Sequence, residues 1–162
     1  MFVQLINMAK TRLWIASPYF VPSPAIVTAL QLAALRGVDI RIMLPLKPDH
    51  LLVYLASFSY LYQMSLPNIR FFRYVDGFMH QKVMLVDNDL ALVGTANTDN
   101  RSFYLNFEVG ILVHNEAFGR DVKNMLEADF LRCRESGITD YKNKNWIFKL
   151  GVRLSHLFAP II

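Results

Sequence analysis

The chain has 162 residues, of which 54% are apolar and 19% are charged, and its formal net charge is +4. This length is typical of one domain with its own core, and the surplus of apolar residues predicts surface for a partner or a membrane. The single cysteine, Cys133, excludes an internal disulfide, and no zinc-type spacing of histidine and cysteine occurs, so we expect chemistry without a metal ion or other cofactor. No signal peptide is recognisable, and the longest uncharged stretch, residues 50–69, contains Pro67 and is not predicted to span a membrane.

The first part of the chain alternates between helix and strand patterns. The expected elements, in chain order, are the end of a helix at 2–10, a strand at 12–17, a helix at 23–36 and a strand at 38–44. The second helix begins with Ser23 and Pro24, a capping residue and the residue favoured at the first helical position, and Gly37 ends it. A strand, helix, strand order favours a parallel pair of strands.

The remaining elements complete an α/β domain with a mixed sheet flanked by helices on both faces. They are an almost entirely apolar helix from Asp49 to Ser65, strands at 68–74, 79–86, 90–93 and 107–113, and helices at 116–135 and 141–158, the last interrupted by Gly151. A tight hairpin around Asn88-Asp89 is expected between the two central strands. We expect residues 1–162 to form a single domain, with 141–162 as a basic amphipathic helix.

His80 and Lys82 are the candidate catalytic pair. Residues two apart in a strand point to the same side, so the imidazole and the ammonium are expected to share one pocket. An imidazole can attack phosphorus or protonate a leaving oxygen near neutral pH, and an ammonium offsets the charge of a phosphodiester.

Four further residues accompany this pair. Thr95 and Asn97, again two apart, can present a hydroxyl and a carboxamide to the same phosphate oxygens. Glu108 is an acid in an apolar run, where a hydrogen bond from the His80 imidazole would satisfy its carboxylate and fix the tautomer. Asp87 is interpreted mainly as a structural turn residue. Each residue alone would have an ordinary structural explanation, but the joint pattern HxKxxxxDxxxxxxG[ST]xN rarely arises by chance.

The segment HQKVMLVDNDLALVGTAN matches the HKD signature of the phospholipase D superfamily. Flanking segments resemble the carboxy-terminal half of the bacterial cardiolipin synthase family: SPYFVP (17–22), LQLAALRGVDIRIMLP (30–45), KPDH (47–50), LVYLAS (52–57), GFMHQKV (77–83) and GTANTDNRSFYLNFEV (94–109). The resemblance implies a phospholipase D-like fold and a metal-free exchange of phosphodiesters through a phosphohistidine, in which two phosphatidylglycerols give cardiolipin and glycerol.

Carried over position by position, the resemblance assigns His80, Lys82 and Asn97 to the catalytic phosphate site. It makes Thr95 a replacement for the commoner serine and Glu108 a support for His80. Family members carry two HKD motifs and membrane spans in one chain, whereas this chain has one motif and no span. The resemblance therefore implies a second HKD half, from the same parent chain or from a homodimer, and a location at the bacterial cell membrane. Whether His80 is the nucleophile or the general acid stays open, with a preference for the acid.

Two other functions remain in competition with lipid phosphatidyl transfer. The same chemistry with water as acceptor would give a phospholipase D or a nuclease-type phosphodiesterase, although no nucleic-acid-reading motif is present and no nucleic acid partner is expected. A catalytically incomplete half could instead serve as a membrane-binding domain.

Three weaker features concern lipid contacts. Tyr19, Lys47 and His50 could line a head-group pocket where two strand ends open on one edge of the sheet, or could be ordinary turn residues. The apolar helix at 50–65 is interpreted either as buried against the missing half or as an acyl-chain contact. In 141–162, a basic face opposite an apolar one suits an anionic membrane surface and equally suits a helix packed on the core.

Overall fold

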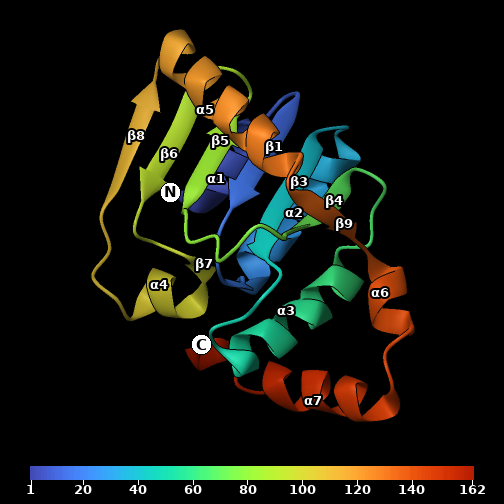
Figure 1. Ribbon diagram of the computed structural model, residues 1–162. Helices are drawn as coiled ribbons and strands as arrows, with labels where there is room; N and C mark the ends of the chain where they lie inside the picture. The colour runs from blue at the N-terminus through green and yellow to red at the C-terminus, as the bar shows by residue number, and fades with distance from the viewer.

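A seven-stranded mixed sheet lies at the centre of the computed structural model, which describes residues 1–162 except the side chains of residues 138 and 139 (Figure 1). The strand order is β8-β6-β5-β1-β3-β4-β9. The strands are β1 (Arg12–Ala16), β3 (Asp39–Pro45), β4 (Ile69–Tyr74), β5 (Val83–Val86), β6 (Leu90–Gly94), β8 (Gly110–His114) and β9 (Cys133–Ser136). The β1–β3 and β3–β4 pairs are parallel and the other four pairs are antiparallel. The parallel pair expected from the strand, helix, strand order is confirmed.

Helices cover both faces of the sheet (Figure 1). One face packs against α1 (Phe2–Met8), α2 (Pro24–Leu35) and α3 (Leu51–Gln63), and the other packs against α5 (Glu116–Phe130). Alternate residues of β1 serve the two cores: Leu13 and Ile15 face the first group of helices, and Trp14 lies in the cluster with Val122 and Leu126 of α5. The α/β fold class with helices on both faces is therefore confirmed.

The central hairpin is confirmed, but its first strand is shorter than expected. β5 and β6 pair from Val83 opposite Val93 to Val86 opposite Leu90, and residues 87–89 connect them, with Asp87 at a φ of 53°. β5 begins at Val83 and not at residue 79, so His80 and Lys82 precede the strand. β8 likewise begins at Gly110, so Glu108 lies before its strand and not within it.

The carboxy-terminal region differs most from the prediction. The helix expected at 116–135 ends at Phe130, and β9 then pairs with β4 as an outer strand of the sheet. The helix expected at 141–158 is two helices, α6 (Ile138–Lys142) and α7 (Trp146–His156), followed by a 3₁₀ turn η1 (Ala159–Ile161). The break falls where the Asn145 side chain caps α7 by accepting from the Phe148 N–H, and α7 continues through Gly151.

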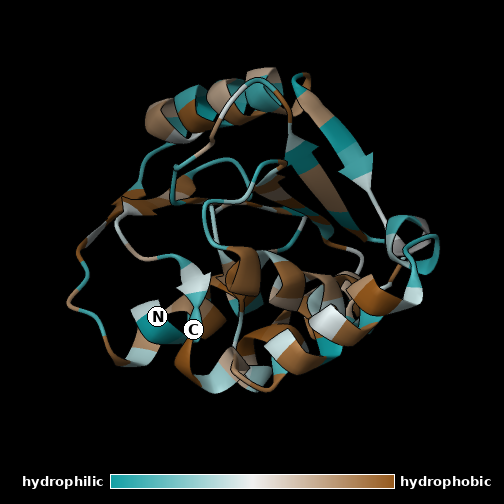
Figure 2. Ribbon diagram, turned by 60° about the horizontal axis from the view of Figure 1, so that its bottom comes forward, coloured by the Kyte–Doolittle hydropathy of each residue, from teal (hydrophilic) through white to brown (hydrophobic). Residues whose placement is uncertain are grey.

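The apolar helix α3 is covered mainly by the chain itself. Phe58 stacks edge-on against Phe148 of α7 at 5.1 Å between centroids, and Ala56, Tyr60 and Leu61 are buried. In Figure 2 the helices in the lower half are largely brown, whereas α5 at the top alternates between teal and brown. One interpretation of the sequence had a second half packing against α3, and in the structure α7 packs there instead. In the part of the chain that the structure describes, no helix has the length and apolarity needed to cross a bilayer.

Candidate active site

Five loops meet at one edge of the sheet, which we call the loop edge. They comprise residues 17–21, 46–50, 78–82, 95–99 and 105–109. Because β1 and β3 are parallel, their carboxyl ends lie together, and the antiparallel β5, β6 and β8 bring the start of β5, the end of β6 and the start of β8 to the same edge. The loop edge therefore collects all the predicted site residues except Asp87, which lies at the opposite end of β5.

A two-stranded sheet ties two of these loops together. β2 (Phe20–Val21) pairs in parallel with β7 (Thr98–Asp99), and the Ser17 hydroxyl accepts a hydrogen bond from the Thr98 N–H at 3.0 Å. The short helix α4 (Asn100–Tyr104) follows directly. None of these three elements was predicted, because two-residue strands and a one-turn helix carry too little periodicity to recognise.

His80 lies on the loop before β5 with its ring exposed. Its neighbours anchor the loop: Met79 is buried in the cluster under α5, and Gln81 donates a hydrogen bond to Asp129 of α5. The His80 ring lies against Phe78, 5.4 Å between centroids, and makes no hydrogen bond to any described residue. Its nitrogens are therefore available to a substrate or a partner.

Lys82 lies near three carboxylates, those of Glu108, Asp49 and Asp99, and lines an apolar cavity. Its ammonium donates to the His80 carbonyl oxygen at 2.8 Å. Burial lowers the pKa of Lys82, and the nearby carboxylates of Glu108, Asp49 and Asp99 act in the opposite direction. An opposite charge nearby favours the charged form of an amine, so these carboxylates offset part of the effect of burial on the pKa of Lys82.

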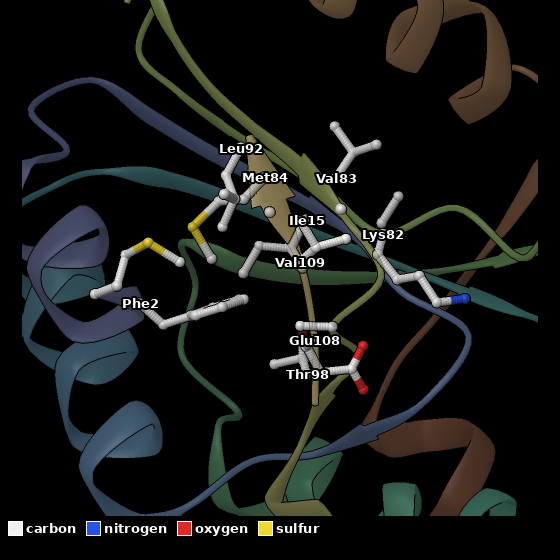
Figure 3. A pocket seen from close by; sticks show the side chains of 14 residues that line it. Phe2, Ile15, Lys82, Val83, Met84, Leu92, Thr98, Glu108 and Val109 are labelled. Atoms are coloured by element: carbon white, nitrogen blue, oxygen red, sulfur yellow. The ribbon is translucent and has the colours of Figure 1, made fainter. Parts of the chain in front are cut away.

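The cavity of about 80 Å³ lies beneath Lys82 and Glu108. Figure 3 shows Phe2, Met84 and Leu92 on its apolar side, whereas the polar ends of Lys82 and Glu108 turn the other way. No group of three or more metal-ligating side chains occurs among the described residues.

Glu108 is bound by Thr95 and Asn106. The Thr95 hydroxyl donates to one carboxylate oxygen and the Asn106 amide donates to the other at 3.1 Å. The hydrogen bond from Thr95 lowers the pKa of Glu108, and Asn106 and Lys82 also lower it against the effect of burial. The expected bond between Glu108 and His80 is not formed within the described residues, and Glu108 is only half-buried, because it precedes β8.

Asn97 and Asp99 lie on the segment that follows β6, and Asp99 is close to Glu108 and Lys82. The Asn97 N–H donates to the Ser102 hydroxyl, and its own carbonyl oxygen Oδ1 is buried without a partner in the described residues. Asp99 caps α4 by accepting from the Ser102 N–H at 2.6 Å, and burial raises its pKa. Asp99 was not predicted, although an aspartate three residues before a serine is a recognisable helix cap.

The residues predicted to line a head-group pocket, Tyr19, Lys47 and His50, lie on the loops that follow β1 and β3. The Tyr19 hydroxyl donates to Asp49, and the Tyr19 ring meets the His50 ring edge-on at 5.7 Å. Burial raises the pKa of Tyr19, and the hydrogen bond to Asp49 raises it further. Lys47 is exposed with no hydrogen bond or ion pair in the described part of the chain. The sequence pattern placed Asp49 only at the start of the apolar helix and did not predict its proximity to Lys82.

Asp87 fastens the start of β1 to the central hairpin. Its carboxylate accepts from the N–H groups of Lys10, Thr11 and Arg12 and from the Thr11 hydroxyl, at 2.8 to 3.1 Å. Burial alone would raise the pKa of Asp87, but these four donors lower it below its ordinary value. Its contacts are structural.

Replacing Asp87 with asparagine is expected to lower the free energy of unfolding by about 1–2 kcal/mol at pH 7, because four bonds lose their charged acceptor. The folded-state pKa lies below the unfolded one, so this stabilisation is present above about pH 4 and disappears as the pH falls through the folded value. Urea unfolding at pH 7 and at pH 3 measures it. Asp89→Asn, which alters only an exposed pair with His114 in the same turn, should cost less than about 0.5 kcal/mol. Equal losses for the two variants would contradict the structural role.

Comparisons with known proteins give a consistent result. A family model described as the PLD-like domain of cardiolipin synthase matches residues 2–132. The protein named cardiolipin synthase A from Pseudomonas fluorescens strain Pf-5 is 47% identical over 161 residues, which cover 99% of this chain and 34% of that protein. Its counterpart from Pseudomonas aeruginosa strain LESB58 is 49% identical over 161 residues, covering 99% and 33%. The chain thus spans about a third of the length of these curated relatives.

Solved structures share the fold at low sequence identity. Nuc from Salmonella typhimurium, described as a phospholipase D family member, superposes with a TM-score of 0.74 at 21% identity, covering 84% of this chain and 88% of that one. Phosphatidylserine synthase from Haemophilus influenzae gives a TM-score of 0.76 at 16% identity, covering 99% of this chain and 44% of that one. The phospholipase D-like fold is confirmed.

Proposed function

Since the chain belongs to the family of cardiolipin synthase PLD-like domains, we propose that it is one catalytic half of a phosphatidyltransferase that makes cardiolipin from two phosphatidylglycerols. The observation that carries this proposal is the loop edge itself. There His80 of the motif lies exposed beside Lys82, with Thr95, Asn97 and Glu108 on the adjoining loops. These residues are the imidazole, cation and hydrogen-bonding groups that exchange at a phosphodiester requires.

The reaction proceeds in two displacements at phosphorus. In the first, a histidine nitrogen attacks the phosphorus of one phosphatidylglycerol, a P–N bond forms, and the P–O bond to the glycerol head group breaks. The departing glycerol oxygen takes a proton from a second histidine. In the second displacement, the head-group hydroxyl of another phosphatidylglycerol returns a proton to that histidine and attacks phosphorus, and the P–N bond breaks.

His80 takes the proton-transferring role in this scheme, and the histidine of the second half takes the nucleophilic one. The exposed, unbonded ring can reach a leaving oxygen and then the incoming hydroxyl. Lys82 offsets the charge of the pentacoordinate phosphorus, and Asn97 and Thr95 contribute an amide and a hydroxyl. Glu108 accepts a hydrogen bond from Thr95 and opposes the effect of burial on the pKa of Lys82.

The surface around Glu108 supports a second HKD half as partner. The loop before β8 and β8 itself expose apolar side chains, namely Leu105, Phe107, Val109 and Ile111, with exposed fractions of 64%, 105%, 66% and 66%. β8 is an outer strand of the sheet, so one row of its backbone groups is unpaired by the sheet. An apolar patch beside catalytic groups is typical of a surface that another subunit or domain covers.

The substrates define where the protein acts. Phosphatidylglycerol is an anionic lipid of the bilayer, so the loop edge must work at the membrane surface. We place the protein at the bacterial cell membrane, with phosphatidylglycerol and the second half as its partners.

Co-expression with a second half tests the proposal. We expect the chain alone to give no turnover with phosphatidylglycerol vesicles. We expect cardiolipin and glycerol in equal amounts when the amino-terminal half of the Pseudomonas aeruginosa relative supplies the other motif. Thin-layer chromatography of labelled lipid and an enzymatic glycerol assay measure both products. Phosphatidic acid as the only lipid product would assign hydrolysis instead, and lipid binding without turnover in every combination would leave a membrane-binding domain.

A further inference from the structure

Helix α7 packs on the rest of the molecule with only one of its sides. Phe148 meets Phe58, Val152 is 1% exposed, and Nδ1 of His156 lies 3.0 Å from the Ser59 hydroxyl. A β-carbon on Gly151 would lie 3.5 Å from Leu55 Cδ1, so Gly151 also faces α3. At about 100° per residue, these positions form one continuous side of the helix that faces α3.

A second side of α7 is apolar and exposed. We call it the α7 apolar surface, and its members are Trp146, Ile147, Leu150, Leu154, Leu157 and, on η1, Ile161. Their exposed fractions are 72%, 61%, 44%, 52%, 73% and 61%. The apolar stripe that fitted both a core-packing helix and a membrane-bound one is therefore not in the core. Contiguous apolar surface of this kind usually marks an interaction site.

The third side of α7 is basic and adjoins the apolar surface. It carries Lys149 and Arg153, and Lys142 and Lys144 precede it, whereas no acidic residue occurs in 141–162. Arg153 is exposed and makes no ion pair within the described residues. Helix α3, the element packed against α7, has no acidic residue either.

We propose that α7 and η1 dock the protein on an anionic lipid bilayer, with the α7 apolar surface inserted among the acyl chains and the basic side against the lipid phosphates. A helix with a tryptophan at one end, an apolar side and flanking cations has the composition of helices that lie in the bilayer interface. A second copy of the chain fits less well, because a two-fold contact through this surface would bring the two basic sides together.

Docking through α7 would bring the loop edge to the membrane. The Asn100 amide of α4 donates to the Ala159 carbonyl oxygen of η1 at 2.8 Å, which joins η1 to the segment that carries Asn97 and Asp99. In Figure 1, the carboxy terminus lies close to α4 and the start of α3. This docking does not depend on the proposed catalysis, because an inactive chain would bind in the same way.

Vesicle binding by the purified chain tests the inference without any activity assay. We expect co-sedimentation with vesicles of phosphatidylglycerol and phosphatidylcholine that weakens as salt rises, and much weaker binding to pure phosphatidylcholine. Leu154→Gln and Leu157→Gln should each lower the affinity about tenfold. Arg153→Gln should lower it a few-fold at low salt.

A matched variant and a positional probe complete the test. Leu131→Gln changes a leucine that is 89% exposed at the end of α5, and it should bind as the unmodified chain does. Trp146 is exposed whereas Trp14 is 2% exposed in the core, so quenching by brominated lipids reports on Trp146. Equal binding by all leucine variants, absence of quenching, or a dimer that Leu154→Gln dissociates would each overturn the inference. Melting curves confirm that each variant is folded.

Discussion

Replacing His80 with asparagine in the two-half enzyme is expected to lower cardiolipin formation by about 10²–10⁴-fold, the usual contribution of a general acid and base. The melting temperature should barely change, because the ring is exposed and makes no hydrogen bond to the described residues. Initial rates of cardiolipin and glycerol release, with a thermal melt of each preparation, measure both effects. His114→Asn provides the control, since His114 is an exposed residue paired with Asp89 away from the loop edge.

The same variant separates the two roles open to His80. A phosphatidyl substrate with a good leaving group, such as p-nitrophenol, needs no proton as it departs. If His80 is the acid, His80→Asn should form the covalent intermediate on the other half at nearly the normal rate with this substrate. If His80 is the nucleophile, the variant should be equally inactive with both substrates and should form no labelled intermediate. Full activity of His80→Asn toward phosphatidylglycerol would remove His80 from the mechanism.

The elements that the sequence pattern predicted correctly are those in which local pattern and tertiary packing agree. β1, α2 and β3 have a periodicity and a length that favour one structure, with Pro24 at the first position of α2, and they form a parallel unit. β9 was missed because it is short, contains the charged Arg134 and Glu135, and follows an amphipathic helix with no glycine or proline between them. Only pairing with β4 makes these residues a strand.

The site was predictable as far as the motif extends. His80 and Lys82 were identified from their spacing, although the strand that was expected to carry them begins only at Val83. The hydrogen-bond partner of Glu108 was predicted wrongly for a related reason. Glu108 precedes β8, and there its carboxylate accepts a hydrogen bond from the Thr95 hydroxyl. Asp49 follows β3, and Lys82 comes near it because β5 pairs with the other side of β1. The parallel pair of β1 and β3 was expected, but the position of β5 beside β1 was not.

Gly94→Ala is the second substitution with a large expected effect. A β-carbon at Gly94 would overlap the Val109 carbonyl oxygen and lie 2.8 Å from the Gly110 Cα, so β6 and β8 could not keep their present spacing. Val109 also exchanges hydrogen bonds with Thr95, at 2.9 and 3.0 Å. We therefore expect a loss of about 1–3 kcal/mol in the free energy of unfolding, and a loss of activity because Thr95 and Glu108 shift.

Gly110→Ala is the matched control for this substitution, because it adds the same methyl group to the facing strand. There the nearest atom is Leu92 Cδ1 at 3.1 Å, the end of a side chain that can move. Urea unfolding and the rate of cardiolipin formation compare the two variants. A larger loss for Gly94→Ala in both measurements would show that the close approach of the two backbones positions Thr95 and Glu108. Equal, small losses would show that β8, as an outer strand, moves freely enough to accept the methyl group, and that the site tolerates its displacement.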